Sequence, residues 1–170
     1  MRTESPEQTV VLGMALGAVA QPGDIILLVG DLGAGKTQFV KGIAQGLGIM
    51  EPVTSPTFNI MLSYSVDSAD TTLPTKTLNH FDLYRLDDVS QLEDIDYFGC
   101  LENDAVSVVE WGDKFPDALP LDYIEVALRI DEESSHVRAI TTVAHGSRAV
   151  ALLAAWIEAA GRSAPIETSA

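Results

Sequence analysis

Short aliphatic runs alternate with stretches of helical periodicity near the start of the chain. Residues 25–29 form an uninterrupted aliphatic run, which is typical of a parallel strand buried on both faces. Apolar residues then recur at helical spacing over 37–47, and Gly46 and Gly48 act as stop signals. The pattern predicts a strand at 24–29, a short loop and a helix at 37–47.

The segment before this strand is apolar on almost every side. Ser5 is a good N-cap, Pro6 suits the first helical position, and Gln8 completes a capping box. A helix with so little polar surface needs to be covered by the rest of the fold. We therefore expect a buried helix that begins at Pro6 and ends before the turn at Pro22-Gly23.

Alternating patterns indicate most of the remaining strands. The segments 58–66 and 75–83 both alternate, and the polar connection between them favours an antiparallel pair. The run at 105–109 predicts another buried strand. Alternation over 123–130 and again over 137–143 predicts a second hairpin.

Two helical segments and a tail complete the predicted fold. Residues 87–96 are acidic and loosely helical, and Tyr97-Phe98-Gly99 closes that segment. Residues 149–159 form an alanine-rich terminal helix, and 161–170 are expected to be a disordered tail. We predict one α/β domain over 1–160, with a mixed sheet of parallel core strands and antiparallel hairpin strands and with helices on both faces.

The loop between the first strand and its helix carries the most specific chemical signal. It matches the phosphate-binding motif G-x-x-x-x-G-K-[ST], in the strand–loop–helix context that the motif needs. Glycines let backbone N–H groups face phosphates, and the helix N-terminus adds positive potential. Lys36 is expected to reach the β- and γ-phosphates, and the Thr37 hydroxyl to bind Mg²⁺. The predicted nucleotide-binding residues here are Gly30, Asp31, Leu32, Gly33, Ala34, Gly35, Lys36, Thr37 and Gln38.

Two acidic residues at predicted strand ends are candidates for holding Mg²⁺ or orienting water. Asp82 and Glu110 each follow an apolar strand, which is the Walker B arrangement, and ligands collect at the carboxyl ends of strands in open α/β sheets. An ordinary strand-end acid is the alternative for either residue. Ser55 and Thr57 lie in a polar loop, where they act either as a switch that senses the γ-phosphate or as a capping turn.

The charge of the chain restricts its partners. The formal net charge is −15, with 25 acidic residues against 10 basic ones. This charge repels a nucleic-acid backbone and disfavours tight direct binding of RNA or DNA. No apolar run reaches transmembrane length, so no membrane association is expected. Cys100 is the only cysteine, so an internal disulfide is excluded.

Four motifs occur in an order that is characteristic of one family. They are the phosphate loop at 30–37, Ser-Pro-Thr-Phe at 55–58, His-Phe-Asp-Leu-Tyr-Arg-Leu at 80–86 and Val-Glu-Trp at 109–111. The chain closely resembles the TsaE (formerly YjeE) family of small bacterial ATPases over roughly residues 5–145. The heptapeptide is the most specific motif, because many families share the phosphate loop. The resemblance implies a P-loop NTPase-like three-layer fold.

The resemblance also implies an activity and partners. Members of the family hydrolyse ATP with Mg²⁺ and serve a complex with two related proteins, TsaB and TsaD. TsaD transfers threonylcarbamoyl onto N6 of adenosine 37 in tRNA, and the TsaE-like ATPase resets that complex between turnovers. Any tRNA contact would then be indirect, through the partners, in agreement with the acidic charge. The chain alone is expected to be a cytoplasmic monomer or weak oligomer.

Roles for individual residues follow from the same resemblance. Lys36 contacts the phosphates, Asp82 orients water or supports the metal, and Trp111 lies beside the site. The adenine is expected near the start of the first helix and near the last hairpin. The catalytic residues implied are Lys36 and Asp82, the metal ligands Thr37 and Glu110, and the further nucleotide contacts Pro6 and Arg138.

Other functions stay open. A small-molecule kinase would pass the γ-phosphoryl group to a substrate, but such kinases carry an arginine-bearing lid, and the segments after residue 86 are acidic and arginine-poor. A nucleotide-dependent binding module with little turnover is a third possibility. Adenine is favoured over guanine, because residues 82–85 lack the glycine of D-x-x-G. His80 could be a general base, although a structural histidine is the commoner case in a strand.

Overall fold

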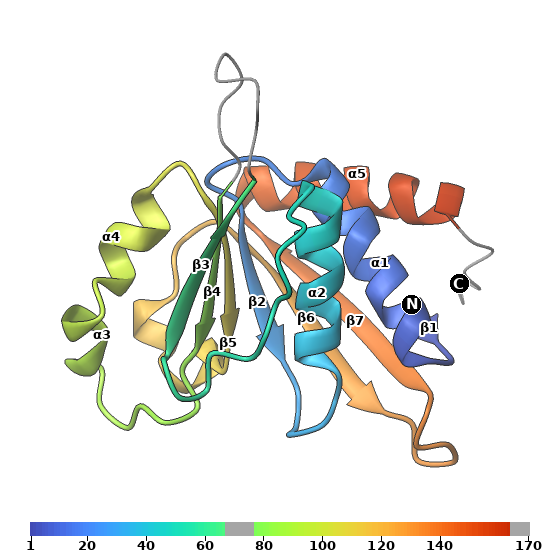
Figure 1. The fold of residues 1–170 in the computed structure, drawn as a ribbon, viewed down its shortest axis with the longest axis horizontal. Coiled ribbons are helices and arrows are strands. Elements are labelled where there is room, and N and C mark those ends of the chain that lie inside the picture. Colours follow the sequence, from blue (N-terminus) through green and yellow to red (C-terminus); the bar gives the residue numbers. More distant parts are fainter. Residues whose placement is uncertain (67–76, 164–170) are drawn as a thin grey trace.

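The computed structural model describes residues 1–66 and 77–163, and these residues form a seven-stranded sheet with helices on both faces (Figure 1). The strand order is β1-β7-β6-β2-β5-β4-β3. The strands are β1 (Arg2–Thr3), β2 (Ile25–Val29), β3 (Met61–Ser65), β4 (Thr77–Asp82), β5 (Val106–Glu110), β6 (Tyr123–Ile130) and β7 (Arg138–His145). β6, β2, β5 and β4 are parallel, whereas β3 pairs antiparallel with β4 and β7 with β6. The predicted mixed sheet with a parallel core and two antiparallel hairpins is confirmed.

Different helices cover the two faces of this sheet. The helices of the described residues are α1 (Pro6–Val19), α2 (Lys36–Leu47), α3 (Gln91–Asp94), α4 (Tyr97–Glu102) and α5 (Gly146–Ser163), with 3₁₀ turns η1 (Gly112–Lys114) and η2 (Pro116–Ala118). Ile26 and Leu28 of β2 join the core beneath α1, α2 and α5, whereas Leu27 joins the opposite core with Tyr97 and Phe115. Burial on both faces therefore explains the unbroken aliphatic run of β2.

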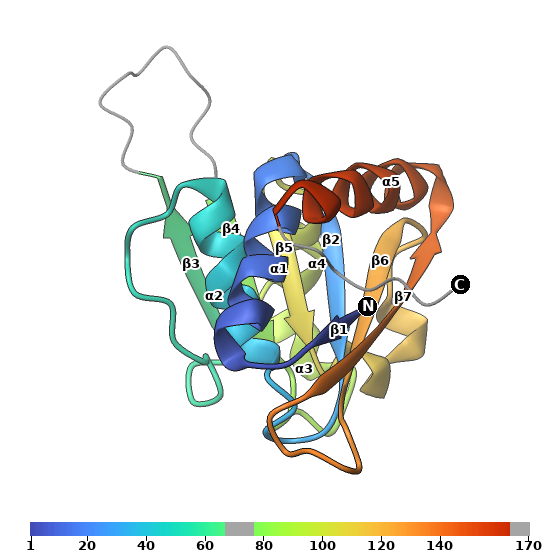
Figure 2. The same cartoon turned by 90° about the vertical axis from the view of Figure 1, so that its right-hand side faces the viewer.

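The helices α1 and α2 lie side by side (Figures 1 and 2), and glycines allow their backbones to touch. A Cβ added to Gly13 or Gly17 of α1 would lie 2.3 or 2.1 Å from a carbonyl oxygen of α2. A Cβ added to Gly42 or Gly46 of α2 would lie 2.1 or 2.2 Å from a carbonyl oxygen of α1. Both helices thus use small residues at the contact. α1 is covered on the side that faces α2, whereas Met14 and Ala18 are exposed, so the prediction of a helix buried on almost every side is only partly confirmed.

The predicted start of α1 is confirmed, with one difference in its cap. The Ser5 hydroxyl accepts a hydrogen bond from the backbone N–H of Gln8 at 3.2 Å, and Pro6 is the first helical residue. The Gln8 side chain accepts from the backbone N–H of Glu4 at 2.6 Å, one residue before the cap. The reciprocal bond of a capping box is therefore shifted by one position.

The first hairpin and the segment after β4 begin later than predicted. β3 starts at Met61, because residues 57–59 form a turn and Ile60 adopts a φ of 66° that a strand cannot continue. Tyr97 begins α4, so the prediction that it closes the preceding segment is wrong. Asp96, with a φ of 51°, separates α3 from α4. The polar connection predicted at 67–74 lies outside the described residues.

The two ends of the chain also differ from the prediction. β1, which the sequence did not reveal, pairs Arg2 with Ala139 and Thr3 with Arg138. Helix α5 begins at Gly146, three residues early, and continues through 163; residues 164–170 lie outside the described part of the chain. Among the described helices, none has the length and apolar character that would cross a membrane.

Candidate functional site

The phosphate loop lies between β2 and α2, at the edge of the sheet where the parallel strands end (Figure 1). Gly33 and Gly35 adopt φ values of 81° and 104°, which glycine tolerates best. Gly30 lies so close to β6 that a Cβ would be 2.3 Å from the Leu128 carbonyl oxygen. Gly35 precedes α2 and has no side chain to cap it, so the N–H groups of the first turn are available to an anion.

Lys36 begins α2 and points back into the phosphate loop. Its ammonium donates to the carbonyl oxygens of Gly30 at 2.7 Å and Asp31 at 3.1 Å, and lies 4.2 Å from the centre of the Trp111 ring. The residue is 5% exposed, and this burial lowers the pKa of Lys36, while the nearby Glu110 carboxylate acts in the opposite direction. Its bonds to carbonyl oxygens are ones that phosphate oxygens can replace.

Asp82 ties the end of β4 to the polar loop that precedes β3. Its Oδ2 accepts hydrogen bonds from the Thr57 hydroxyl at 2.5 Å and the Ser55 hydroxyl at 3.3 Å. Its Oδ1 accepts from the backbone N–H of Tyr84 at 3.1 Å. Asp82 is 4% exposed as a whole residue, so these bonds satisfy a nearly buried carboxyl group. The sequence placed these residues in separate motifs, and the fold joins them.

Glu110 ends β5 directly beside Asp82, because the two residues are partners in the β4–β5 register. Its Oε1 lies 2.9 Å from Nε2 of His80, which is fully buried, and Glu110 itself is 3% exposed. Both carboxylates therefore lie at the carboxyl edge of the parallel strands, next to the lysine of the phosphate loop. His80 is a partner of the candidate metal ligand.

Two aromatic side chains, Trp111 and Tyr84, lie at the edge of the site. Trp111 has a φ of 63°, rare for a bulky residue, and its ring centre lies 5.1 Å from that of Tyr84. Lys114 donates hydrogen bonds to the carbonyl oxygens of Tyr84 and Leu86. The half-buried Trp111 therefore lies at the edge of the site next to Lys36, and it also packs against the hydrophobic core on this face of the sheet.

Arg138 begins β7 and reaches across to the phosphate loop. Its Nε donates to the Ala34 carbonyl oxygen at 2.7 Å and its Nη2 to that of Gly33 at 3.4 Å. Its Nη1 donates to the carbonyl oxygens of Ser135 and Val137 at 2.7 and 2.9 Å. The guanidinium thus links the loop between β6 and β7 to the phosphate loop.

A small cavity of about 130 Å³ lies beside the Arg138 side chain. Its walls come from α1, the phosphate loop, α2 and the connection between β6 and β7. They are lined by Pro6, Thr9, Gly33, Gly35, Gln38, Ser135, His136 and Arg138. The predicted contacts Pro6, Gln38 and Arg138 therefore meet. Thr9, Ser135 and His136 were missed, because nothing in their spacing shows that the hairpin end folds onto α1.

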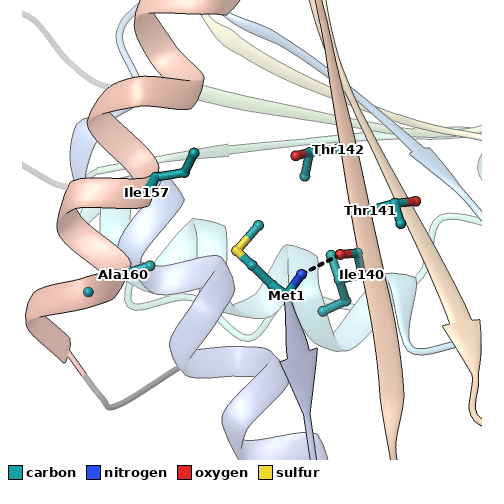
Figure 3. A pocket seen from close by; sticks show the side chains of 7 residues that line it. Met1, Ile140, Thr141, Thr142, Ile157 and Ala160 are labelled. Atoms are coloured by element: carbon teal, nitrogen blue, oxygen red, sulfur yellow. Dashed lines mark hydrogen bonds between the residues drawn. The ribbon is translucent and has the colours of Figure 1, made fainter. Parts of the chain in front are cut away.

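A larger cavity of about 350 Å³ lies between α5, β7 and the N-terminal residue (Figure 3). It is lined by Met1, Ile140, Thr141, Thr142, Ile157, Ala160 and Gly161. The Met1 ammonium donates to the Ile140 carbonyl oxygen at 2.8 Å. No lining residue comes from the phosphate loop, β4 or β5, so this cavity is not part of the phosphate site.

Oxygen donors from the end of β5 and from the first turn of α2 suit a hard cation that keeps other ligands. Thr37 and Glu110 offer oxygen atoms, which Mg²⁺ prefers, and Mg²⁺ typically takes one or two carboxylates together with phosphate oxygens and water. Over residues 1–66 and 77–163, no three His, Cys, Asp or Glu side chains are grouped to bind a metal ion by themselves. The residues thus fit a cation that arrives with a phosphate ligand.

A parallel α/β core, a glycine loop leading into α2 and strand-end carboxylates define a P-loop fold. More particularly, the chain belongs to the TsaE family: the model of the "Threonylcarbamoyl adenosine biosynthesis protein TsaE" family matches residues 3–140. The family prediction made from the four motifs is confirmed.

Individual relatives agree over most of the chain. The Bacillus subtilis (strain 168) tRNA threonylcarbamoyladenosine biosynthesis protein TsaE is 40% identical over 147 residues, which are 86% of this chain and 86% of the relative. The Treponema pallidum (strain Nichols) protein of the same name is 37% identical over 128 residues, 75% of this chain and 89% of its own. The crystal structure of Bacillus subtilis YdiB matches with a TM-score of 0.73 at 32% identity and covers 93% of both chains.

Proposed function

We propose that this chain is a Mg²⁺-dependent ATPase that serves tRNA threonylcarbamoyladenosine biosynthesis together with TsaB and TsaD. The observation that carries the proposal is the buried Lys36, held inside a glycine loop beside Glu110 and Asp82. Membership of the TsaE family supports the pathway. The ATPase activity and the two partners are proposed on the family resemblance and on the chemistry of this site.

The phosphate loop is the proposed binding site of the triphosphate. The first-turn N–H groups of α2 and the ammonium of Lys36 offer positive charge to the phosphates. On binding, Lys36 exchanges the carbonyl oxygens of Gly30 and Asp31 for β- and γ-phosphate oxygens. Because the ammonium is nearly buried, its attraction for phosphate is screened less than that of an exposed lysine.

The two strand-end carboxylates have different proposed roles: Glu110 binds the cation and Asp82 positions the polar loop. Thr37 and Glu110 would hold Mg²⁺, which neutralises the charge that develops on the phosphates as the γ-phosphoryl group leaves. Asp82 holds the hydroxyls of Ser55 and Thr57 in place, and these hydroxyls order water on the phosphate side of the loop. In this proposal the polar loop acts as a switch that is fastened to β4.

The small cavity near α1 is the proposed place for the adenine. Its volume of about 130 Å³ is below the roughly 300–1,000 Å³ of pockets that enclose whole ligands, so it can take only part of a nucleotide. It opens between Gln38 and the Ser135–Arg138 end of the hairpin, next to the phosphate loop. Arg138 supports this site by fixing the Gly33 and Ala34 carbonyls.

The acidic chain favours a protein partner over direct tRNA contact. A net charge of −15 repels phosphate backbones, so in this proposal tRNA is bound by the partner proteins. Isolated chain and tRNA should show no complex at physiological salt. A sub-micromolar complex in a filter-binding assay would contradict this part of the proposal.

Phosphate release with and without the TsaB–TsaD pair tests the proposal. We expect Mg²⁺-dependent release that rises when the pair is added. Lys36→Ala and Glu110→Ala should lower it by about 100-fold or more, since Lys36 acts on the phosphates directly and Glu110 acts through the Mg²⁺ that it would hold. Lys41→Ala on α2 and Glu102→Ala at the exposed end of α4 make the same charge changes and should keep the native rate.

Two alternatives give different results in the same assay. A small-molecule kinase would transfer the γ-phosphoryl group to a metabolite without either partner. A binding module would hold Mg²⁺–ATP but release no phosphate even with the pair present. Either result would overturn the ATPase proposal, and normal metal binding and turnover by Glu110→Ala would overturn the metal assignment.

A further inference from the structure

His80 contacts the candidate metal ligand Glu110, and its hydrogen-bonding pattern has no role in the proposed function. Its side chain is 0% exposed on β4, and its Nε2 lies 2.9 Å from Oε1 of Glu110. Over residues 1–66 and 77–163, its Nδ1 has no hydrogen-bond partner. An imidazole that is fully buried, with a hydrogen bond to a strand-end carboxylate on one nitrogen and none within the described residues on the other, needs an explanation.

The unpartnered nitrogen identifies the tautomer. A carboxylate only accepts hydrogen bonds, so Nε2 must carry the proton that it shares with Glu110. If Nδ1 also carried a proton, a buried donor would be left without an acceptor, which is costlier than a bare nitrogen lone pair. The arrangement therefore fits a neutral imidazole with its hydrogen on Nε2.

We propose that His80 is the positioning residue of Glu110: it donates Nε2–H to Oε1 and so fixes the carboxylate with Oε2 left for the cation. The inference rests on the proposed role of Glu110 as a Mg²⁺ ligand. A neutral donor orients the carboxylate without cancelling its charge, whereas a lysine or arginine at this place would compete with the cation. Partners of this kind set the orientation of metal ligands in many sites.

The position of His80 in the sheet gives the contact its rigidity. β4 is flanked by β3 and β5, so the backbone of His80 is held from both sides. Its register partner on β5 is Val108, two residues before Glu110, and the imidazole therefore lies along the strand toward the carboxylate. A side chain fixed in this way can hold one rotamer of Glu110 before any ligand arrives.

Two substitutions separate orientation from simple packing. His80→Leu removes the donor at similar volume, and His80→Gln keeps an amide N–H that can reach Oε1. With a nonhydrolysable ATP analogue bound, Mn²⁺ affinity measured by electron paramagnetic resonance should fall about 10–100-fold in His80→Leu and recover largely in His80→Gln. Affinity for the analogue in EDTA should stay native in both variants. His145→Gln, at the end of β7, is the matched control and should keep native Mn²⁺ affinity.

Nitrogen NMR of histidine-labelled native protein gives a test that needs no metal. The His80 signals, assigned by their loss in His80→Gln, should show a protonated Nε2 and an unprotonated Nδ1. A protonated Nδ1 would overturn the inference, and so would native Mn²⁺ affinity in His80→Leu or equal losses in the two variants. If the native chain binds the analogue equally with Mn²⁺ and with EDTA, the proposed function fails, and the NMR result still decides the His80 contact.

Discussion

The contact between α1 and α2 predicts a large effect for the addition of one methyl group. In Gly17→Ala the new Cβ would lie 2.1 Å from the Ile43 carbonyl oxygen and 2.8 Å from its carbon. Carbon and oxygen atoms in contact normally lie about 3.3–3.6 Å apart, so the helices must separate by roughly 1 Å. The obstacle is backbone, which no rotamer change can remove.

Two opposing terms set the size of the effect. Overpacking a close contact destabilises by about 1–3 kcal/mol, and this site belongs at the upper end because both sides are backbone. Alanine restores up to about 1 kcal/mol of helix propensity over glycine. The net loss is therefore about 2 kcal/mol, or roughly 4–8 °C in Tm for a chain of this length.

Urea denaturation followed by circular dichroism measures this loss. Gly161→Ala is the matched control: it makes the same change in α5, where a Cβ would meet no atom within 4 Å. The control should be stabilised by up to about 1 kcal/mol. Native stability in Gly17→Ala would refute the argument that backbone contact limits the distance between the two helices. Nucleotide affinity should fall with stability, since Pro6 of α1 and Gln38 of α2 line the same cavity.

Three further predictions concern single side chains. Burial raises the pKa of Tyr97 from 10.0 to about 12, so the folded state keeps a proton that the unfolded chain loses above pH 10. Relative to Tyr97→Phe, the native chain should thus lose about 1.4 kcal/mol of unfolding free energy by pH 11; parallel pH curves for the two proteins would contradict this. Thr57→Val removes the 2.5 Å hydrogen bond to Asp82 and should lower the free energy of unfolding in urea by about 1–3 kcal/mol. An unchanged free energy of unfolding would contradict the proposal that this bond holds the polar loop to β4. Arg138→Ala and Arg138→Lys should both weaken ADP binding measured by calorimetry, because a lysine ammonium cannot span the Gly33 and Ala34 carbonyl oxygens that the guanidinium bridges. Native ADP affinity in Arg138→Lys would contradict this role of the guanidinium.

The elements that the sequence could predict are those whose signals are local. The strand at 25–29, the glycine loop and the start of α1 at Pro6 follow from burial pattern, motif and capping, each of which acts within a few residues. The β3–β4 hairpin followed from alternation, yet its start did not. The positive φ of Ile60 depends on a turn that closes against Pro56, and a β-branched residue gives no warning of it.

The parts of the site that could not be predicted come from distant segments. Asp82 and Glu110 were each recognisable at a strand end, but their adjacency is a property of the β4–β5 register. The contacts of Arg138 with the Ala34 carbonyl join residues 104 positions apart. For His80 the sequence leaves both a general base and a structural histidine open, and only its distance to Glu110 links it to the proposed chemistry.

Crystals of the native chain grown with Mn²⁺ and a nonhydrolysable ATP analogue would show where the nucleotide and the cation bind. We expect an anomalous Mn²⁺ peak between Thr37, Glu110 and the phosphates, the triphosphate along the phosphate loop, and the adenine in the cavity between Pro6 and Arg138. A nucleotide bound elsewhere, or a Mn²⁺ peak away from Glu110, would contradict this expectation.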